Sequence, residues 1–128
     1  MSLSASPASA REARRFVRAR VGELGFHRVM DDVALVATEL VTNALLHVQS
    51  SSQVSVYLRH GRIRLEVSDD SSVLPVRRSF SADAATGRGL ALVESLCAAW
   101  GATLSPDGGK VVWADFDVIV DRSRVIPT

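Results

Sequence analysis

A row of polar side chains follows one edge of a predicted amphipathic helix. Apolar residues recur at helical spacing over residues 30–48, and Glu39, Asn43 and His47 succeed one another at one-turn intervals along the border of that apolar face. A carboxylate can accept a proton, and an amide oxygen one turn away can bind Mg²⁺, a cation that needs few protein ligands. If they stood alone, these residues would be interpreted as part of a solvated helix face.

Two further segments offer polar groups of the kind that bind a nucleotide. Asp69 ends a predicted half-buried strand, where a carboxylate is costly unless it accepts hydrogen bonds, for example from the exocyclic amino group of a base. Gly87, Arg88 and Gly89 close a long loop and open a helix, so backbone N–H groups and one guanidinium are available to phosphates. Simpler roles stay open, because aspartate also caps turns and glycine also forms hinges. Together with the helical row, the segments predict a nucleotide pocket with a lid.

The general nucleotide and hydrolase motifs are not found. Residues 87–92 lack the third glycine of G-x-G-x-x-G and follow a loop, and residues 109–111 lack the other parts of a Walker A loop. The single cysteine, Cys97, excludes an intramolecular disulfide, and no G-x-S-x-G segment marks a nucleophile. A Rossmann domain, a P-loop NTPase and nucleophilic hydrolysis are therefore not supported.

Three helices are predicted from apolar spacing and capping signals. The first begins near residue 7 and stops before Gly25, which suits a left-handed C-cap. The second, over residues 30–48, carries the polar row. The third covers residues 89–100 and follows a long loop without apolar periodicity. Loops of this length in a compact domain are usually functional or mobile.

Two hairpins are predicted from alternating apolar residues. One covers residues 53–68, and the other joins residues 102–105 to residues 110–118 through a turn rich in glycine. Trp113 is expected in the core. With the helices packed on one face of a mainly antiparallel sheet, the fold class is an α+β two-layer sandwich.

Length and composition indicate one globular domain. The chain has 128 residues, of which 47% are apolar and 23% charged, so we expect a single domain over residues 1–120 and a frayed tail over residues 121–128. A net charge of +1 argues against direct nucleic-acid binding. The chain has neither a signal sequence nor an apolar run of membrane-spanning length, so we expect a cytoplasmic protein with no membrane contact.

Four short motifs occur in a set order along residues 8–118. They are Glu39-Leu-Val-Thr-Asn43-Ala-Leu-Leu-His47, Val67-Ser-Asp69, Gly87-Arg-Gly89-Leu90 and Gly108-Gly-Lys110-Val-Val-Trp113. In this combination the chain resembles the GHKL ATPase superfamily, and it is most similar to the small anti-sigma-factor serine/threonine kinases in the form common in actinobacteria. The resemblance implies a Bergerat-type fold, with ATP held between a mainly antiparallel mixed sheet, the second helix and a long lid.

The resemblance also implies roles for individual residues. Glu39 matches the catalytic general base, Asn43 matches the asparagine that coordinates Mg²⁺ between the phosphates, and Asp69 matches the aspartate that binds the adenine amino group. No role is implied for His47. The other positions that it assigns to nucleotide binding are Gly87, Arg88, Gly89, Leu90 and Lys110.

A kinase of this type has two protein partners. The resemblance implies that Mg²⁺-ATP supplies the γ-phosphoryl group to a serine of a STAS-type anti-anti-sigma protein, and that the same surface otherwise holds a sigma factor; a homodimer stays open. Two departures from the family pattern are Asp69-Asp70-Ser71-Ser72-Val73, where the family has D-x-G-x-G, and Val111, where threonine is usual. The departure after Asp69 favours an alternative, an ATP-binding interaction module with little or no phosphoryl transfer that acts as an accessory signalling subunit.

Overall fold

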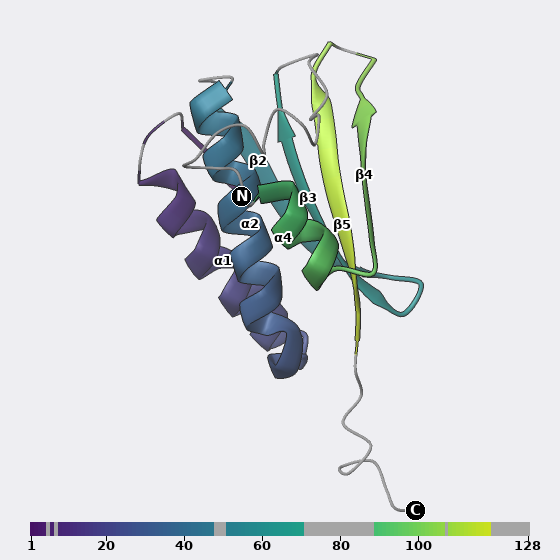
Figure 1. Cartoon of the computed structure of the whole chain (residues 1–128). Coiled ribbons are helices and arrows are strands. Elements are labelled where there is room, and N and C mark those ends of the chain that lie inside the picture. The colour runs from purple at the N-terminus through teal and green to yellow at the C-terminus, as the bar shows by residue number, and fades with distance from the viewer. Residues whose placement is uncertain (5, 7, 48–50, 71–88, 107, 119–128) are drawn as a thin grey trace, which may run out of the picture.

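The protein folds as a layer of helices packed on one face of a sheet (Figure 1). The computed structural model describes residues 1–4, 6, 8–47, 51–70, 89–106 and 108–118. In chain order the described elements are β1 (Ser2–Leu3), α1 (Ser9–Glu23), α2 (His27–His47), β2 (Ser52–Arg59), β3 (Arg62–Asp69), α4 (Gly89–Leu96), β4 (Ala99–Leu104) and β5 (Lys110–Asp117). The predicted α+β two-layer sandwich is confirmed.

The described strands form one sheet in the order β1-β2-β3-β5-β4. Every neighbouring pair among them is antiparallel. The β2–β3 hairpin turns at His60 and Gly61, whose φ angles of 51° and 76° are both positive, as a two-residue type I′ turn requires. Both predicted hairpins are confirmed, and the pairing of β3 with β5 joins them, so that these two strands lie inside the sheet.

Strand β1 has no counterpart in the sequence prediction, because two residues are too few to show alternation. It pairs with the start of β2, where the Met1 ammonium donates a 2.8 Å hydrogen bond to the Val54 carbonyl. The Val54 N–H donates in return to the Met1 carbonyl at 2.8 Å. The strand adds Leu3, which is 2% exposed, to the core.

Helices α1 and α2 form an antiparallel pair that turns at Gly25, whose φ is 89°. Helix α1 turns one face to the core, where Ala13, Val17 and Val21 are fully buried. The boundaries differ from the prediction: α1 begins at Ser9 instead of near residue 7, and α2 begins at His27 instead of residue 30. None of the described helices is both long and apolar enough to cross a membrane.

Helix α4 is shorter than predicted and ends at Leu96, so the expectation of a helix up to Trp100 is wrong. The Ala98 N–H donates a 2.8 Å hydrogen bond to the Asp115 carbonyl of β5, so the chain joins the sheet before another helical turn can form. Strand β4 consequently begins earlier than predicted and contains Trp100. That indole packs against the edge of the core.

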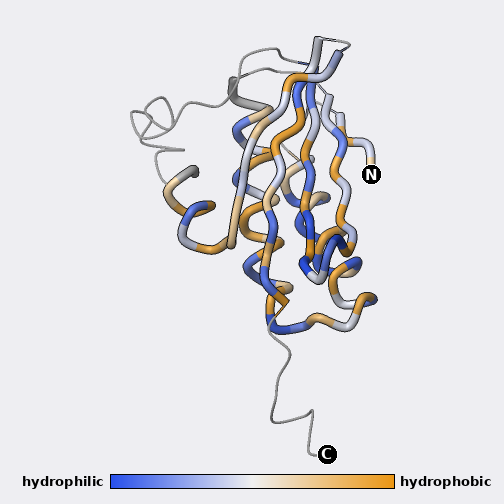
Figure 2. Tube along the Cα trace, turned by 90° about the vertical axis from the view of Figure 1, so that its right-hand side faces the viewer, coloured by the Kyte–Doolittle hydropathy of each residue, from blue (hydrophilic) through white to orange (hydrophobic). Residues whose placement is uncertain are grey.

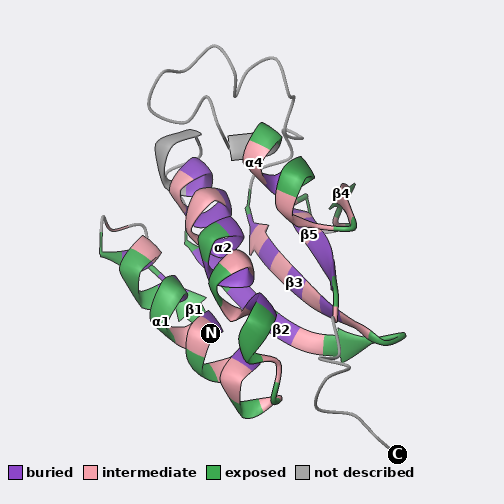
Figure 3. Cartoon of the chain, turned by 60° about the horizontal axis from the view of Figure 1, so that its bottom comes forward, coloured by how far each residue is buried: buried purple, intermediate pink, exposed green. Residues whose placement is uncertain are grey.

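The sheet has one buried face and one open face. Along β3 and β5, apolar and polar residues alternate, as the colours of Figure 2 show, and the apolar ones face the helices. Figure 3 shows the buried positions gathered between the sheet and the helices. On the two central strands the buried apolar residues are Ile63, Leu65, Val67, Val112, Ala114 and Phe116.

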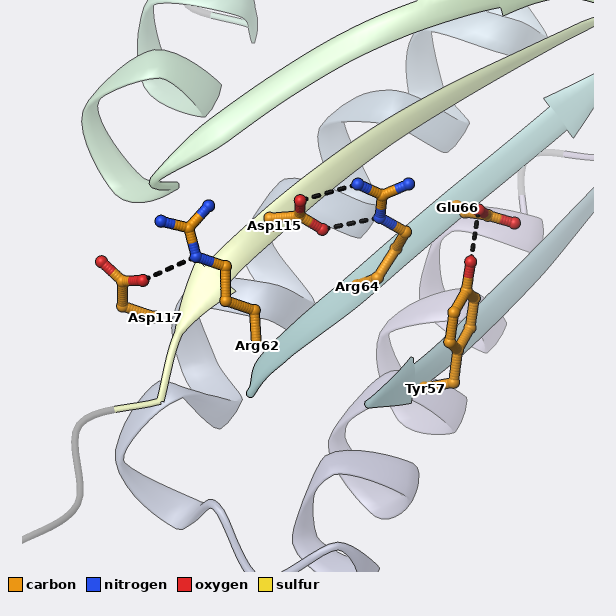
Figure 4. A network of polar contacts seen from close by, with 6 residues as sticks. All are labelled: Tyr57, Arg62, Arg64, Glu66, Asp115 and Asp117. Atoms are coloured by element: carbon orange, nitrogen blue, oxygen red, sulfur yellow. Dashed lines mark hydrogen bonds and ion pairs between the residues drawn. The ribbon is translucent and has the colours of Figure 1, made fainter. Parts of the chain in front are cut away.

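Polar side chains cross-link the open face. Figure 4 shows Tyr57 with Glu66, Arg64 with Asp115, and Arg62 with Asp117. Arg64 donates two hydrogen bonds of 2.7 Å to Asp115, and these bonds lower the pKa of the Asp115 carboxyl. The expectation that Trp113 is a core residue is wrong: its ring lies on this face, 4.3 Å from the Arg64 guanidinium carbon. It lies so close to Gly101 that a Cβ there would be 2.6 Å from the ring.

The tyrosine of this face gives a prediction about pH. The Tyr57 hydroxyl donates a 2.6 Å hydrogen bond to Glu66, and this bond, with partial burial and the nearby carboxylate charge, raises the pKa of Tyr57 above its usual 10.0. Because the folded value is raised, the stabilisation is present below the unfolded pKa and is lost as the pH rises through the folded pKa. Since Tyr57 is the one tyrosine of the chain, tyrosinate absorbance reports its titration directly.

In Glu66→Gln the titration midpoint of Tyr57 should move back toward that of free tyrosine. Asp117→Asn is the matched control, because this open-face carboxylate pairs with Arg62 instead. Identical midpoints in the wild type and in Glu66→Gln would contradict the assigned cause.

Candidate functional site

The predicted site segments gather at one end of the molecule. In Figure 1 the C-terminal part of α2, the end of β3 and the start of β5 lie at the same end of the molecule, and Figure 3 shows α4 beside the C-terminal part of α2, which it contacts. The ends of the two strands are in register, with Asp69 opposite Lys110. The fold therefore brings residues from four distant parts of the chain to one region.

Asn43 is a buried amide for which the described residues offer no hydrogen-bond partner. The residue is 5% exposed, and neither Nδ2 nor Oδ1 finds a partner within the described part of the chain. A buried polar group left in this state costs about 1–3 kcal/mol. Because buried polar groups in native proteins are almost always satisfied, an orphaned amide is expected where a ligand supplies the missing partners.

Glu39 lies one helical turn before Asn43 on α2 and is half-buried. The helix therefore places a carboxylate and the orphaned amide next to each other on its surface, as the sequence predicted. An amide oxygen is a suitable Mg²⁺ ligand, and the amide N–H groups can donate to phosphate oxygens. The two side chains fit the Mg²⁺-ATP that the resemblance implies, while their individual roles stay predictions.

Asp69 forms a buried ion pair with Lys110. The lysine Nζ donates hydrogen bonds of 2.9 and 2.8 Å to the two carboxylate oxygens, and the side chains are 4% and 8% exposed. Sequence reasoning treated both as separate nucleotide-binding positions and missed this pair. The available signal was alternation: Asp69 continues the buried face after Val67, and Lys110 precedes Val112 on the buried face of β5.

Gly109 lets the two strand ends approach closely. A Cβ placed on Gly109 would lie well inside van der Waals contact with the Asp69 carbonyl oxygen. The backbone of β3 therefore packs against the chain just before Lys110, and no larger residue fits there without movement. This contact fixes where the Asp69 backbone lies relative to β5.

The remaining predicted residues are described only in part or not at all. Gly87 and Arg88 lie outside the described residues, as does the long loop that was predicted as a lid. Gly89 is the first residue of α4 and Leu90 follows it, so the predicted start of this helix is confirmed. His47 is the last residue of α2, and its side chain lies outside the described part.

Comparison with known proteins places this geometry in a family. The sequence pattern of the family described as the histidine kinase-like ATPase domain matches residues 3–115, which is most of the chain. A search of curated proteins returns no match. The family assignment therefore comes from the domain pattern, and the solved structures bear on the fold.

Two of the solved structures that match illustrate the shared fold. The histidine kinase domain of the blue-light activated histidine kinase from Erythrobacter litoralis EL346 superposes with a TM-score of 0.52 at 23% identity, over 70% of this chain and 48% of that one. A longer structure of the same kinase gives a TM-score of 0.53 at 23% identity, over 72% of this chain and 31% of that one. The chain thus spans less than half of each of these proteins.

The domain match, the antiparallel sheet under helices and the shared fold agree with one another. The chain belongs to the histidine kinase-like ATPase family of the GHKL superfamily, whose domain is an ATP-binding module.

Proposed function

We propose that this protein is an ATP-dependent serine/threonine protein kinase that controls a sigma factor. In this proposal it binds Mg²⁺-ATP, phosphorylates a STAS-type anti-anti-sigma protein, and otherwise sequesters the sigma factor, which implies a cytoplasmic location. The observation that carries the ATP site is the buried amide of Asn43, which finds no hydrogen-bond partner among the described residues. The choice of partners is supported by the resemblance of the four motifs to small anti-sigma-factor kinases.

The proposal gives Asn43, Asp69 and Glu39 one chemical task each. The Asn43 oxygen holds Mg²⁺, and the Asp69 carboxylate accepts a hydrogen bond from the adenine amino group. ATP, when bound, supplies the γ-phosphoryl group. Glu39 accepts the proton of the attacking hydroxyl, whose oxygen bonds to the phosphorus as the bond to the leaving ADP breaks.

Calorimetric titration with ATP, with and without Mg²⁺, tests the pocket. We expect saturable, Mg²⁺-dependent binding in the wild type that is strongly weakened in Asn43→Ala. Thr42→Val is the matched control, because it removes one polar group from the neighbouring, half-buried position of α2. Absence of binding at millimolar ATP would overturn the proposed function.

Glu39→Gln tests the transfer step separately from binding. The amide keeps the size of the side chain but accepts a proton poorly, so transfer to a purified STAS-type protein should fall by about 10²–10⁴-fold. Binding of ATP should stay within about twofold of the wild type, a change of less than about 0.5 kcal/mol. The measurement is incorporation of label from γ-labelled ATP, with Glu94→Gln, on the exposed face of α4, as the control.

Undiminished transfer in Glu39→Gln would remove the general-base assignment. Binding of ATP without any label transfer by the wild type would instead favour the second function, an interaction module that uses ATP as a ligand. The replacement of the usual glycines by Ser71 and Val73 after Asp69 is the feature that supports this second function.

A further inference from the structure

The ion pair between Asp69 and Lys110 lies on the helix-facing side of the sheet. Both residues occupy positions that elsewhere on β3 and β5 hold apolar side chains. Burying two charges is expensive, and a well-packed apolar pair is often as stable or more stable in such a place. A charged pair at the end of the core therefore calls for a reason other than stability.

The pair constrains the carboxylate. One ammonium bonds both oxygens of Asp69, at 2.9 and 2.8 Å, so rotation of the carboxylate about its last torsion would break at least one bond. That torsion is otherwise broad and roughly two-fold. The backbone of Asp69 is held as well, because its carbonyl packs against Gly109. Both ends of the residue are thus fixed by the chain that begins β5.

We propose that Lys110 is a positioning residue that makes the site selective for the base of the nucleotide. Its ammonium orients the Asp69 carboxylate so that an oxygen accepts a hydrogen bond from a 6-amino group and opposes a 6-oxo group, whose lone pairs face the same oxygen. This inference rests on the proposed function, since it assumes that Asp69 contacts the base. It changes the task of Lys110 from contacting the nucleotide to holding the residue that does.

Relative affinity for ATP and inosine triphosphate tests this role. The two nucleotides share the sugar and phosphates and differ at one edge of the base, where ATP has a 6-amino group beside an unprotonated N1 and inosine triphosphate has a 6-oxo group beside N1–H. We expect the wild type to bind ATP at least about tenfold more tightly, as one hydrogen bond to a charged acceptor allows. In Lys110→Met this ratio should fall to about one to threefold, because the freed carboxylate no longer discriminates. A merely structural lysine would weaken both nucleotides equally and leave the ratio unchanged.

The same two strands provide the matched control. Arg64 and Asp115 form another ion pair directly across β3 and β5, with side chains 12% and 11% exposed, but on the open face. Arg64→Met removes the cation of this pair, so it should lower the melting temperature and keep the ratio of the wild type. A ratio that falls equally in Arg64→Met and Lys110→Met would overturn the proposal.

Lys110→Arg covers the case in which Lys110→Met does not fold. Arginine keeps the positive charge, so Asp69 retains a counter-charge, but its planar fork bonds a carboxylate in a different geometry. We expect a folded protein whose preference for ATP is reduced at least about threefold, and an unchanged ratio in every folded variant at position 110 would overturn the inference. If the wild type bound neither nucleotide, the proposed function would fail together with the inference. If the wild type bound ATP and the variants at position 110 kept its selectivity, only the inference would be wrong.

Discussion

The Asn43→Leu variant should melt at a higher temperature than the wild-type protein and bind Mg²⁺-ATP much more weakly. Leucine has nearly the branched shape of asparagine and removes two buried polar atoms that have no partner among the described residues. Relief of such atoms is worth about 1–3 kcal/mol, and leucine is also the better helix former by a few tenths of a kcal/mol. At roughly 4 °C per kcal/mol for a domain of this size, the shift should be easily measured by circular dichroism.

The loss of binding has the same origin as the gain in stability. Each hydrogen bond from Asn43 to a charged ligand contributes about 1.5–3 kcal/mol, so the Kd for Mg²⁺-ATP should rise by roughly 10- to 100-fold. The measurement is calorimetric titration at the temperature used for the wild type. A binding residue is expected to raise the affinity for its ligand while it lowers the stability of the free protein. An amide with a structural role would instead be hydrogen-bonded within the protein when no ligand is bound.

Thr42→Val is again the control, because it removes a polar group next to Asn43 but on another side of α2. It should change the melting temperature little and leave the Kd unaltered. If Asn43→Leu were less stable than the wild type, the amide would have to be satisfied in solution without ATP. If it still bound ATP normally, Asn43 would lie outside the pocket.

Most of the fold was predictable because each long element repeats one period. The buried face of α2 and the alternation along β2, β3 and β5 extend over enough residues to identify helix and strand. The prediction was wrong where an element is too short to show its hydrophobic periodicity, or where the chain changes from one kind of element to another within a few residues. Strand β1 is two residues long, and α4 stops at Leu96 because a hydrogen bond from Ala98 to β5 competes with the next helical turn.

The sequence was sufficient to predict which residues form the candidate site, but not which contacts they make with one another. The one-turn spacing of Glu39 and Asn43 follows from helical geometry alone, whereas the burial of the amide depends on how the helices and the sheet pack around α2. The pair of Asp69 and Lys110 joins residues 41 positions apart, so it depends on the register between β3 and β5. Alternation could have placed both charges on the buried face, which already requires that each have a partner.

Gly109→Ala is expected to disrupt both the sheet end and the site. The added methyl group would overlap the Asp69 carbonyl oxygen, which is backbone and has little freedom to move inside a strand pair. Overpacking of this kind costs about 1–3 kcal/mol. Because Asp69 must shift away from β5, its carboxylate leaves the position set by Lys110. The Kd for ATP should therefore rise at least about tenfold. A lower free energy of unfolding would not by itself change the Kd of the protein that remains folded.

Gly108→Ala separates this effect from the general cost of losing a glycine. Its φ of 96° makes alanine strained by about 1–2 kcal/mol, but beyond the two adjacent residues no atom of the described part of the chain lies within 4 Å of the added methyl group. The two variants should therefore lose similar stability in thermal melts, while calorimetric titration finds weakened ATP binding in Gly109→Ala only. Equal binding in both would mean that the close approach of Gly109 to Asp69 serves the sheet and not the nucleotide.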